Sequence, residues 1–578
     1  MLDFLWKNST VAHVLPAVPR DHGIFSVTPT QPNVLTLIDA NPVVLELIRH
    51  IVHHHWPGGI KSIAEHTDHV ISATLSTSLF RGTSGPFQKG ANGEVSQCAR
   101  RLFCELLMAL EHQGWMLLTN TQLSQTNNST LFFYKSNDAP LLSRAEQPGP
   151  SSAHANMSVN PIMCVSLSKK SIMHLIYPEP MPDRALIHKM LIEAIGADLI
   201  DSKPLETVSG NVLHLRGSPW MMHYSRKNSV AGRHLILRLF RQLAAIDYHF
   251  IGTVNMKSTA DSMFFQKGPG LHHLDLSRGP HQFGLISLNS SNLIRLFDLP
   301  PTVRDAVVAC VAQHWPFGID EQVTAQKEAD CDELKLEGAP WSSCGEQFAC
   351  AHQLLTYMMS HLRTLGWQCI ASPTLSPDID HKSVFILRSC PPLRVPHFVL
   401  APQHKRNLVV CGAQQMQDWV TNFMEDYYVD IGSLADTYDD SVAESADEGD
   451  NDSNNTHIRF SGSTRPWVAT KGNDWAWSIM AIGRMLLALR RTHWIPVCAA
   501  VTSSRIIESE DHPPVKVDMN AMFFQYVKHQ PACPVHSTMR HNGSQQPTGH
   551  NHDDAENDVA PPPSYEEVVV SDRLQQQR

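Results

Sequence analysis

The stretch from Arg101 to Trp115 reads RLFCELLMALEHQGW, and it decides the fold of the chain. Four apolar residues lie 12, 9, 8 and 5 positions before the tryptophan: Phe103, Leu106, Leu107 and Leu110. Spacings of three and four residues place these side chains on one face of an α-helix. The stretch therefore predicts an amphipathic helix that buries this face and ends just before Trp115.

The same pattern occurs three more times, and each copy ends at an aromatic residue. We call Trp115, Tyr248, Trp367 and Trp494 the four anchor residues. At the same four offsets the later copies have Ile236, Leu239, Phe240 and Leu243, then Leu355, Met358, Met359 and Leu362, then Ile482, Met485, Leu486 and Leu489. A pattern that returns four times predicts internal repeats instead of one isolated amphipathic helix.

The flanks of these helices repeat as well. Before each helix, a short alternating run and a turn lead to an aromatic residue, which is Phe87, Trp220, Trp341 or Trp467. These residues lie 28, 28, 26 and 27 positions before the anchors. After each anchor we expect a strand, a polar turn and a closing strand, which contains residues 131–133, 263–265, 384–386 or 522–524. The agreement of the spacings indicates duplication.

We therefore expect an α+β fold of four tandem units, each with the approximate order β-β-α-β-α-β-β. The first and third units share a helix stop, at His55-Trp56-Pro57 and at His314-Trp315-Pro316, because proline does not continue a helix. The second and fourth units share Met-Phe-Phe-Gln, at residues 263–266 and 522–525. This pairing predicts two rounds of duplication with an A-B-A-B order.

Composition shifts predict the boundaries of these units. Linkers rich in serine, proline and glycine separate some units, and polar stretches without an apolar stripe are expected to be disordered. The expected parts are an irregular arm at 1–30, unit one at 31–135, a linker at 136–160, unit two at 161–267, a linker at 268–281, unit three at 282–392, unit four at 393–528 with a disordered acidic insertion at 430–456, and a disordered tail at 529–578.

The charge of the chain is concentrated in the acidic insertion. The 578 residues carry a formal net charge of -10, and eleven acidic residues with no lysine or arginine lie between Glu425 and Asp452. Without that stretch the charge is about +1, so a basic nucleic-acid-binding face is not expected. No apolar run reaches the roughly 18 residues that a membrane-spanning helix needs. We expect no nucleic-acid partner and no membrane span.

The cysteines and the N-terminal residues predict where in the cell the protein is located. The twelve cysteines are scattered without a CxxC pair, which favours reduced thiols in a cytoplasmic protein, with a nuclear location left open. Residues 1–19 contain Asp3 and Lys7 and no continuous apolar run, so a signal peptide is not expected.

The sequence contains no motif for catalysis, a cofactor or a metal. The aromatic residues of the repeats are expected to fill the core, and His55 and His314 to cap the last carbonyls of their helices. Cys533 and His536 have a plausible ligand spacing, but a zinc site needs a second pair of ligands. We find no phosphate-binding loop, GxSxG or HExxH motif, so no catalytic residue, cofactor or metal is predicted.

One short motif in the tail points to a partner. Residues 561–567 read PPPSYEE and contain Pro-Pro-x-Tyr, formed by Pro562, Pro563 and Tyr565. The motif resembles the ligands of WW domains in NEDD4-type ubiquitin ligases. Prolines form a polyproline II helix at little ordering cost, and the tyrosine provides a large anchor for a pocket. The resemblance implies that WW-domain proteins bind these three residues.

Two functions of different classes follow. The first is an adaptor, scaffold or substrate protein that recruits a WW-domain ubiquitin ligase through its tail, while the repeats bind an unknown protein partner. The alternative is an enzyme or small-ligand receptor with its site in a cleft between repeat units. A group of perturbed titratable residues in one such cleft would favour the alternative.

Overall fold

The computed structural model describes most of the chain between Gly23 and Val527. The described residues are 23–30, 33–77, 92–123, 129–135, 160–168, 170–178, 181, 183–196, 199–201, 205–207, 210–220, 226–255, 261–268, 281–320, 331–343, 346–376, 382–403, 407–427, 455–459, 467, 473–509 and 512–527. The predicted WW-binding residues Pro562, Pro563 and Tyr565 lie outside them, as do most of the acidic insertion and the tail.

The chain forms four antiparallel sheets in sequence order, and we call each sheet with its helices a module. Module one contains β1 (Ile24–Thr30), β2 (Val34–Ile38), α2 (Pro42–His55), β3 (Ile60–Thr67), β4 (Val70–Leu75), α3 (Asn92–His112), β5 (Trp115–Thr121) and β6 (Thr130–Lys135). Module two contains β7 (Ile162–Ser168), β8 (Ile172–Ile176), α4 (Arg184–Ile195), β9 (Leu205–Thr207), β10 (Gly210–His214), α5 (Arg226–Ala245), β11 (Tyr248–Val254) and β12 (Ser262–Lys267).

Modules three and four have one strand fewer in the described residues. Module three contains β13 (Phe283–Asn289), β14 (Leu293–Phe297), α6 (Pro301–His314), β15 (Asp332–Lys335), α7 (Glu346–Thr364), β16 (Trp367–Ala371) and β17 (Val384–Ser389). Module four contains β18 (His397–Gln403), β19 (Asn407–Cys411), α8 (Gln414–Tyr427), β20 (Asn455–Arg459), α9 (Asn473–Arg491), β21 (Trp494–Ser509) and β22 (His512–Tyr526).

The strand order is shared among the sheets. The third sheet has the order β15-β14-β13-β17-β16 and the fourth β20-β19-β18-β22-β21. The first and second sheets have the same central order and one more strand at the outer edge, β3 and β9. The eight helices of the described residues connect strands within each sheet. The expected mixture of helices and strands is therefore confirmed, and the sheets are antiparallel.

Two predictions about module one are wrong. The arm expected at 1–30 includes β1, which lies inside the sheet between β2 and β6. All seven residues of β1 are buried. The strand therefore lacks the alternation of apolar and polar residues that is typical of a strand with one solvent-exposed face. The expected order β-β-α-β-α-β-β also omits a strand, because both β3 and β4 separate α2 from α3. Most residues of β3 are exposed, so no apolar pattern marked it.

The boundary expected for the acidic insertion is also wrong at one end. Asn455 and Thr456 were expected to be disordered, but they begin β20 and pair with Cys411 and Val410 of β19. The alternating run expected before Phe87, at residues 79–82, lies outside the described residues, as does Phe87 itself.

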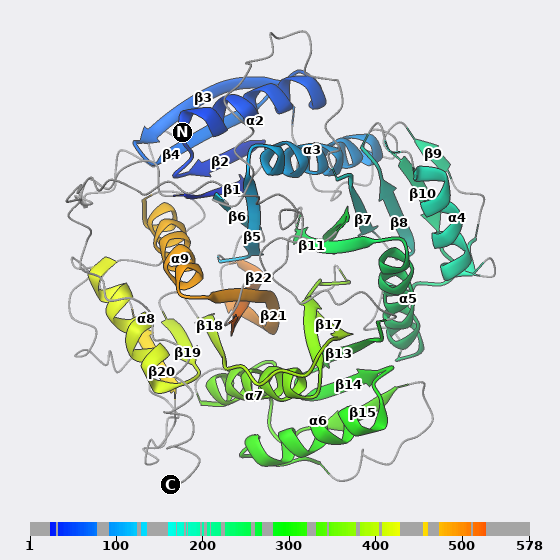
Figure 1. The fold of residues 1–578 in the computed structure, drawn as a ribbon, viewed down its shortest axis with the longest axis vertical. Helices are drawn as coiled ribbons and strands as arrows, with labels where there is room; N and C mark the ends of the chain where they lie inside the picture. The colour runs from blue at the N-terminus through cyan, green and yellow to red at the C-terminus, as the bar shows by residue number, and fades with distance from the viewer. Residues whose placement is uncertain are drawn as a thin grey trace, which may run out of the picture.

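The long second helix of each module packs against two sheets. Helix α3 contacts β5 of its own sheet and also β7 and β8 of the next. In the same way α5 packs on β13, and α7 packs on β18 and β19. Helix α9 contacts β1 and β2, so the last module meets the first. Figure 1 shows the result, a closed ring with α3, α5, α7 and α9 around its centre.

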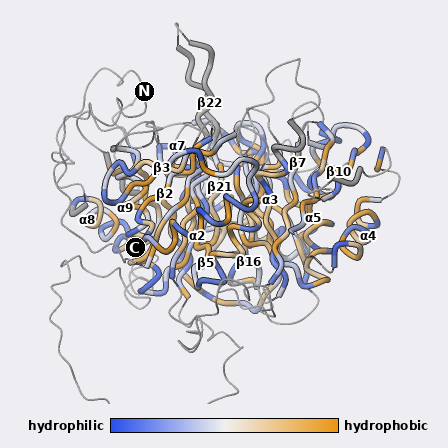
Figure 2. The backbone as a smooth tube through the Cα atoms, turned by 90° about the horizontal axis from the view of Figure 1, so that it is seen from above, coloured by the Kyte–Doolittle hydropathy of each residue, from blue (hydrophilic) through white to orange (hydrophobic). Residues whose placement is uncertain are grey.

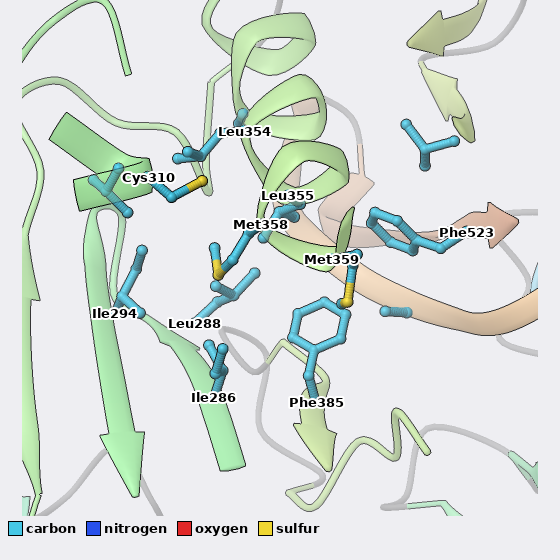
Figure 3. Packing of buried hydrophobic residues seen from close by; sticks show 14 of the residues in the cluster. Ile286, Leu288, Ile294, Cys310, Leu354, Leu355, Met358, Met359, Phe385 and Phe523 are labelled. Atoms are coloured by element: carbon cyan, nitrogen blue, oxygen red, sulfur yellow. The ribbon is translucent and has the colours of Figure 1, made fainter. Parts of the chain in front are cut away.

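The central strands of each sheet are buried on both faces because of this arrangement. Each of the four apolar clusters combines the helices of one module with strand residues from the next. Figure 3 shows one of them, in which Met358 of α7 faces Leu288 while Met359 lies beside Phe385. Phe523 of module four lies on the far side of the same helix. Figure 2 shows the ring from its edge. Segments of hydrophobic residues lie mostly between its two rims, and hydrophilic segments gather at the rims.

The four predicted helical stripes are buried. At the offset of eight residues before each anchor, Leu107, Phe240, Met359 and Leu486 are 4 %, 3 %, 5 % and 0 % exposed. Each belongs to the cluster formed by its own module. No helix in the described part of the chain is both long enough and apolar enough to span a bilayer.

Truncating any of these four residues to alanine should lower the free energy of unfolding by about 2–5 kcal/mol, because each change leaves a cavity in a packed core. Chemical denaturation of the full chain measures this loss. The exposed Leu186 of α4 provides the control, since Leu186→Ala removes little buried surface. Equal effects at Leu186 and at the four stripe positions would contradict the assignment of the stripes to the core.

Candidate functional site

The strands that begin at the anchors meet at the centre of the ring. Strand β5 contacts β11 and β21, and β16 contacts the same two strands. Each of the four has a bulge two to four residues after its anchor, between residues 117 and 119, 250 and 252, 369 and 371, and 496 and 498. A bulge at one shared position bends each inner strand in the same way.

Hydrogen bonds between modules form a cycle around this centre. The residue seven positions after each anchor contacts a residue of a neighbouring module that lies just before its closing strand in modules one, two and three and inside β22 in module four. The pairs are Asn255 N to Ser129 Oγ at 2.7 Å, Asp261 N to Thr374 O at 2.9 Å, Ser383 N to Val501 O at 2.8 Å, and Asn520 N to Gln122 O at 3.1 Å. Two of the contacts are reciprocal, since Thr374 N donates to Asp261 Oδ2 and Val501 N to Ser383 Oγ.

The centre encloses little space. A cavity of about 60 Å³ lies among the four bulges and is lined by residues 117–120, 250–253, 370–372 and 495–499. Asn120 bridges it by accepting from Thr253 N and donating to Thr253 Oγ1 at 2.8 Å. This volume holds a few water molecules, whereas small-molecule sites have about 300–1,000 Å³. The cavity is too small for an ordinary substrate.

Buried polar residues cross the interfaces between modules, and sequence reasoning missed them. At the fourth interface, Arg484 Nε of α9 lies 3.7 Å from Asp39 Oδ2 of module one. At the other three, the polar residues share one offset. Arg100, Arg233 and His352 each lie fifteen positions before an anchor and are 1–3 % exposed. Arg100 Nε donates to Ser262 Oγ at 3.1 Å, and His352 Nε2 contacts Thr502 Oγ1 at 2.7 Å. The fourth position is the apolar Ile479. The shared offset was visible in the sequence, but isolated polar residues in a helix do not show that they face a second sheet.

The second interface has the largest polar group. Arg233 Nε donates to Ser287 Oγ at 2.6 Å, and its terminal nitrogens donate to Ser229 O at 2.8 Å and to Asn289 Oδ1 at 2.7 Å. Burial, with repulsion from Arg295 second, lowers the pKa of Arg233 to about 9. Arg295 pairs with Glu333 at 2.7 Å. Because a buried cation without hydrogen bonds is costly, this network fixes how module two fits module three.

Two histidines at the third interface are held neutral. Burial lowers the pKa of His352 to about 4 and that of His397 to about 3. His397 Nδ1 contacts Ser360 Oγ of α7 at 3.0 Å. At the first interface, burial raises the pKa of Glu111 to about 7, and this carboxyl accepts a hydrogen bond from Gln266. These perturbed groups lie in packed interfaces between modules.

A larger open groove lies on the outside of module one. It has a volume of about 610 Å³ between α2 and β3, and its lining is Glu46, Arg49, His50, His53, Ile60, Lys61, Ser62 and Ile63. Strand β3 is the outer edge of the first sheet. Ile60 and Ile63 are half-buried, while Arg49 and Lys61 are exposed. The groove therefore combines a partly apolar floor with a charged rim.

The aromatic residues singled out in the sequence are core residues where they are described. Trp115, Trp220, Trp341, Trp367, Trp467 and Trp494 are all at most 5 % exposed. This confirms the expectation that they fill the junctions of helices and strands.

The expectation for the two matched histidines is wrong. His55 does not cap its helix; its Nδ1 lies 3.7 Å from Glu105 Oε1 of α3. The ring of His314 stacks on Tyr357 of α7 with 4.2 Å between centroids. Both partners lie ten positions before an anchor, so the histidines join the two helices of their modules. The described residues contain no group of three or more metal-ligating side chains, and Cys533 and His536 lie outside them.

Comparison with known proteins supports the repeats. The model of one domain family, which carries no functional description, matches residues 23–136, 161–266 and 282–388. These three segments cover more than half of the chain. The chain belongs to this family. The matched segments correspond to modules one, two and three, and residues after 388 are not matched. No curated protein and no solved structure matches the chain.

Arg233→Met should lower the free energy of unfolding by about 2–4 kcal/mol, because Ser287, Ser229 and Asn289 then lose a buried partner. Arg238→Met is the matched control, since Arg238 is an exposed residue of the same helix and should change stability by less than about 0.5 kcal/mol. Urea denaturation compares the two. A loss at Arg233 no larger than at Arg238 would show that the network contributes nothing.

The two buried histidines should make the protein less stable in acid. Their folded pKa values of about 4 and about 3 lie below 6.5, so the unfolded chain binds protons first and stability falls as the pH drops below 6.5. Glu111 has the opposite sign, because its raised pKa of about 7 makes the folded state bind the proton between pH 7 and 4.5.

A differential measurement separates these effects. The slope of stability against pH between 6.5 and 5 should become smaller by about 1.4 kcal/mol per pH unit for each of His352→Gln and His397→Gln. Glu111→Gln should instead steepen the acid loss. Urea midpoints at several pH values give the slopes. Identical slopes for the parent and the histidine variants would mean that neither histidine is held neutral.

Proposed function

We propose that the chain is an adaptor or substrate protein that recruits a WW-domain ubiquitin ligase of the NEDD4 type through Pro562, Pro563 and Tyr565. The motif Pro-Pro-x-Tyr is the single observation that carries this proposal. Two prolines pre-form the extended helix that fits an aromatic groove, and the tyrosine fills the adjacent pocket. The contact requires the tail to lie in the cytoplasm or the nucleus, as the cysteine pattern also suggests.

The arrangement of the body supports a scaffold role. A closed ring holds its modules in fixed positions and leaves its outer surface for partners. The perturbed groups Arg233 and His352 are engaged in packed interfaces between modules. We therefore assign to the outer surface of the ring the binding of the unknown protein partner.

We further propose that the ring consists of four copies of one unit with an A-B-A-B origin, and that module four is a diverged copy. Its sheet has the strand order of the third sheet, and its anchor Trp494 has a bulge and an inter-module contact at the shared offsets. The A-type helices α2 and α6 both begin with a proline and end beside a tryptophan cap.

The structure supports the alternative of an enzyme or small-ligand receptor less well than the adaptor. It requires a cleft between modules, and the central cavity of about 60 Å³ is small for a substrate. The larger groove of about 610 Å³ lies within module one, where His50 and His53 have no neighbouring acid other than Glu46 in the lining. We therefore retain the adaptor as the proposed function.

A WW array from a NEDD4-type ligase should capture the full chain and the Ser564→Ala variant equally, because Ser564 occupies the variable position of the motif. Tyr565→Ala should abolish capture by removing the pocket anchor. One such contact corresponds to roughly micromolar affinity, so the array provides the multivalency that retains the complex.

A chain ending at Asp558 serves as the negative control in the same pull-down, since it lacks the motif but retains every described residue. Equal capture of the full chain, the Tyr565→Ala variant and this shortened chain would contradict the proposal.

A further inference from the structure

Among the described residues, the outer edge of module one is open to addition of another strand. Strand β3 has eight residues and is the last strand of its sheet in this part of the chain, where it pairs with β4. Between its bulges, Ser62, Ile63, Ala64 and Glu65 pair in regular register with β4. Alternate residues of such a run direct backbone N–H and C=O groups to the free side, where an extended peptide can pair with them.

The groove beside this edge has a defined chemistry. Ile60 and Ile63 are half-buried and provide apolar surface. Arg49 and Lys61 provide two positive charges against one negative charge from Glu46, and His50 and His53 lie along the same wall. The Arg49–Glu46 ion pair is about half exposed on both sides, so it holds Arg49 only weakly. This combination suits an extended peptide with acidic and aliphatic side chains.

The chain contains such a peptide next to its WW motif. Residues 566–572 read EEVVVSD, with two glutamates followed by three valines. Valine is among the residues that most favour strands. We propose that this segment pairs with the free edge of β3, placing valines over Ile60 and Ile63 and glutamates beside Arg49 and Lys61. The inference rests on the proposed function, because it makes the docked tail a regulator of the adjacent motif.

The tail is long enough for this contact. Val527 is the last described residue, and its N–H donates to His493 O in module four. Module four packs on β1 and β2, and β4 lies between β2 and β3, so the edge is about 15 Å from β1 at the usual strand spacing. The 38 residues between Val527 and Glu566 span about 35 Å as a flexible chain.

Because the tail and the groove belong to one chain, a weak contact between them is enough for docking. A linker of this length gives an effective concentration on the order of a millimolar. A peptide contact that is weak between separate molecules therefore keeps the tail on the groove for much of the time. Because Tyr565 directly precedes the docked segment, a WW domain must displace the segment before its pocket receives the tyrosine. The contact lowers the apparent affinity for the ligase.

The first test needs no WW domain. A fluorescent peptide of residues 560–574 is titrated into the chain ending at Asp558, and anisotropy reports binding. The double variant Arg49→Glu/Lys61→Glu should weaken binding at least tenfold, and raised salt should weaken it in the parent. The matched control Lys170→Glu/Arg216→Glu makes the same charge change at exposed sites of module two and should leave the affinity unchanged.

Charge reversal of the peptide completes this design. A peptide with Glu566→Lys and Glu567→Lys should bind the parent chain poorly. It should regain affinity for the Arg49→Glu/Lys61→Glu variant, which we call the reversed groove. A peptide with Tyr565→Ala should bind the groove like the parent peptide, although it lacks the WW anchor. Unchanged affinity for the reversed groove, or no binding at millimolar peptide, would overturn the proposal. Tighter binding of a peptide of residues 434–448 would also overturn it by identifying the acidic segment as the occupant.

The second test uses the full chain and a WW array. Arg49→Glu/Lys61→Glu should increase capture several-fold, because the tail is released, whereas the module two control should not. If no full-length variant binds the array while the peptide still binds the groove, the proposed function fails and the groove assignment stands. Equal capture by the parent and the reversed groove would overturn the regulatory role.

Discussion

The packing of one helix against two sheets is the interaction on which the rest of the structure depends. Each long helix completes the core of its own module and covers the outer face of the next sheet. Such head-to-tail contacts close into a ring when the rotation between modules brings the last onto the first, as α9 does on β1 and β2. Closure buries both faces of the central strands of all four sheets, so no module needs the polar cap that an open array requires.

The polar residues inside the interfaces specify which modules meet. Arg100 and Arg233 face serines on the next module, His352 reaches Thr502, and the fourth place has Ile479. In module one, Thr28 and Thr130 bond to each other at 3.0 Å, and Asp39 pairs with Arg484 of α9 at 3.7 Å. A guanidinium placed in the wrong interface would lack its serine and remain buried without a partner, which is costly. The differences therefore disfavour exchange of modules that otherwise share one pattern.

Much of the fold follows from the sequence because the helical stripes end at aromatic anchors. The offsets correctly predict four long helices, the burial of residues such as Phe240 and Leu486, and core positions for the tryptophans. The sequence did not reveal β1 because a strand that is buried on both faces shows no alternation of apolar and polar residues. It did not reveal β3 because most residues of that strand are exposed, so no apolar pattern marks it. Closure of the ring could not be predicted, since a stripe shows that a helix buries a face but not which sheet covers it.

The site was less predictable than the fold for a related reason. Polar contacts recur fifteen residues before three of the anchors, and backbone contacts recur seven residues after all four, but the partners of these residues become visible only when two modules lie side by side. The groove beside β3 depends on an edge strand that the sequence did not reveal. The motif around Tyr565 was found because a linear peptide needs no fold.

The central claim is that module four closes the ring on module one, and Gly483 of α9 tests it most directly. A Cβ at this glycine would lie 3.3 Å from the ring of Phe132 in β6, so a larger side chain must displace that ring. A double-mutant cycle measures the coupling in unfolding free energy between Gly483→Leu and Phe132→Ala. The account predicts that the double variant is more stable than the sum of the single effects requires, by about 1 kcal/mol or more. Additive effects would contradict closure of the ring.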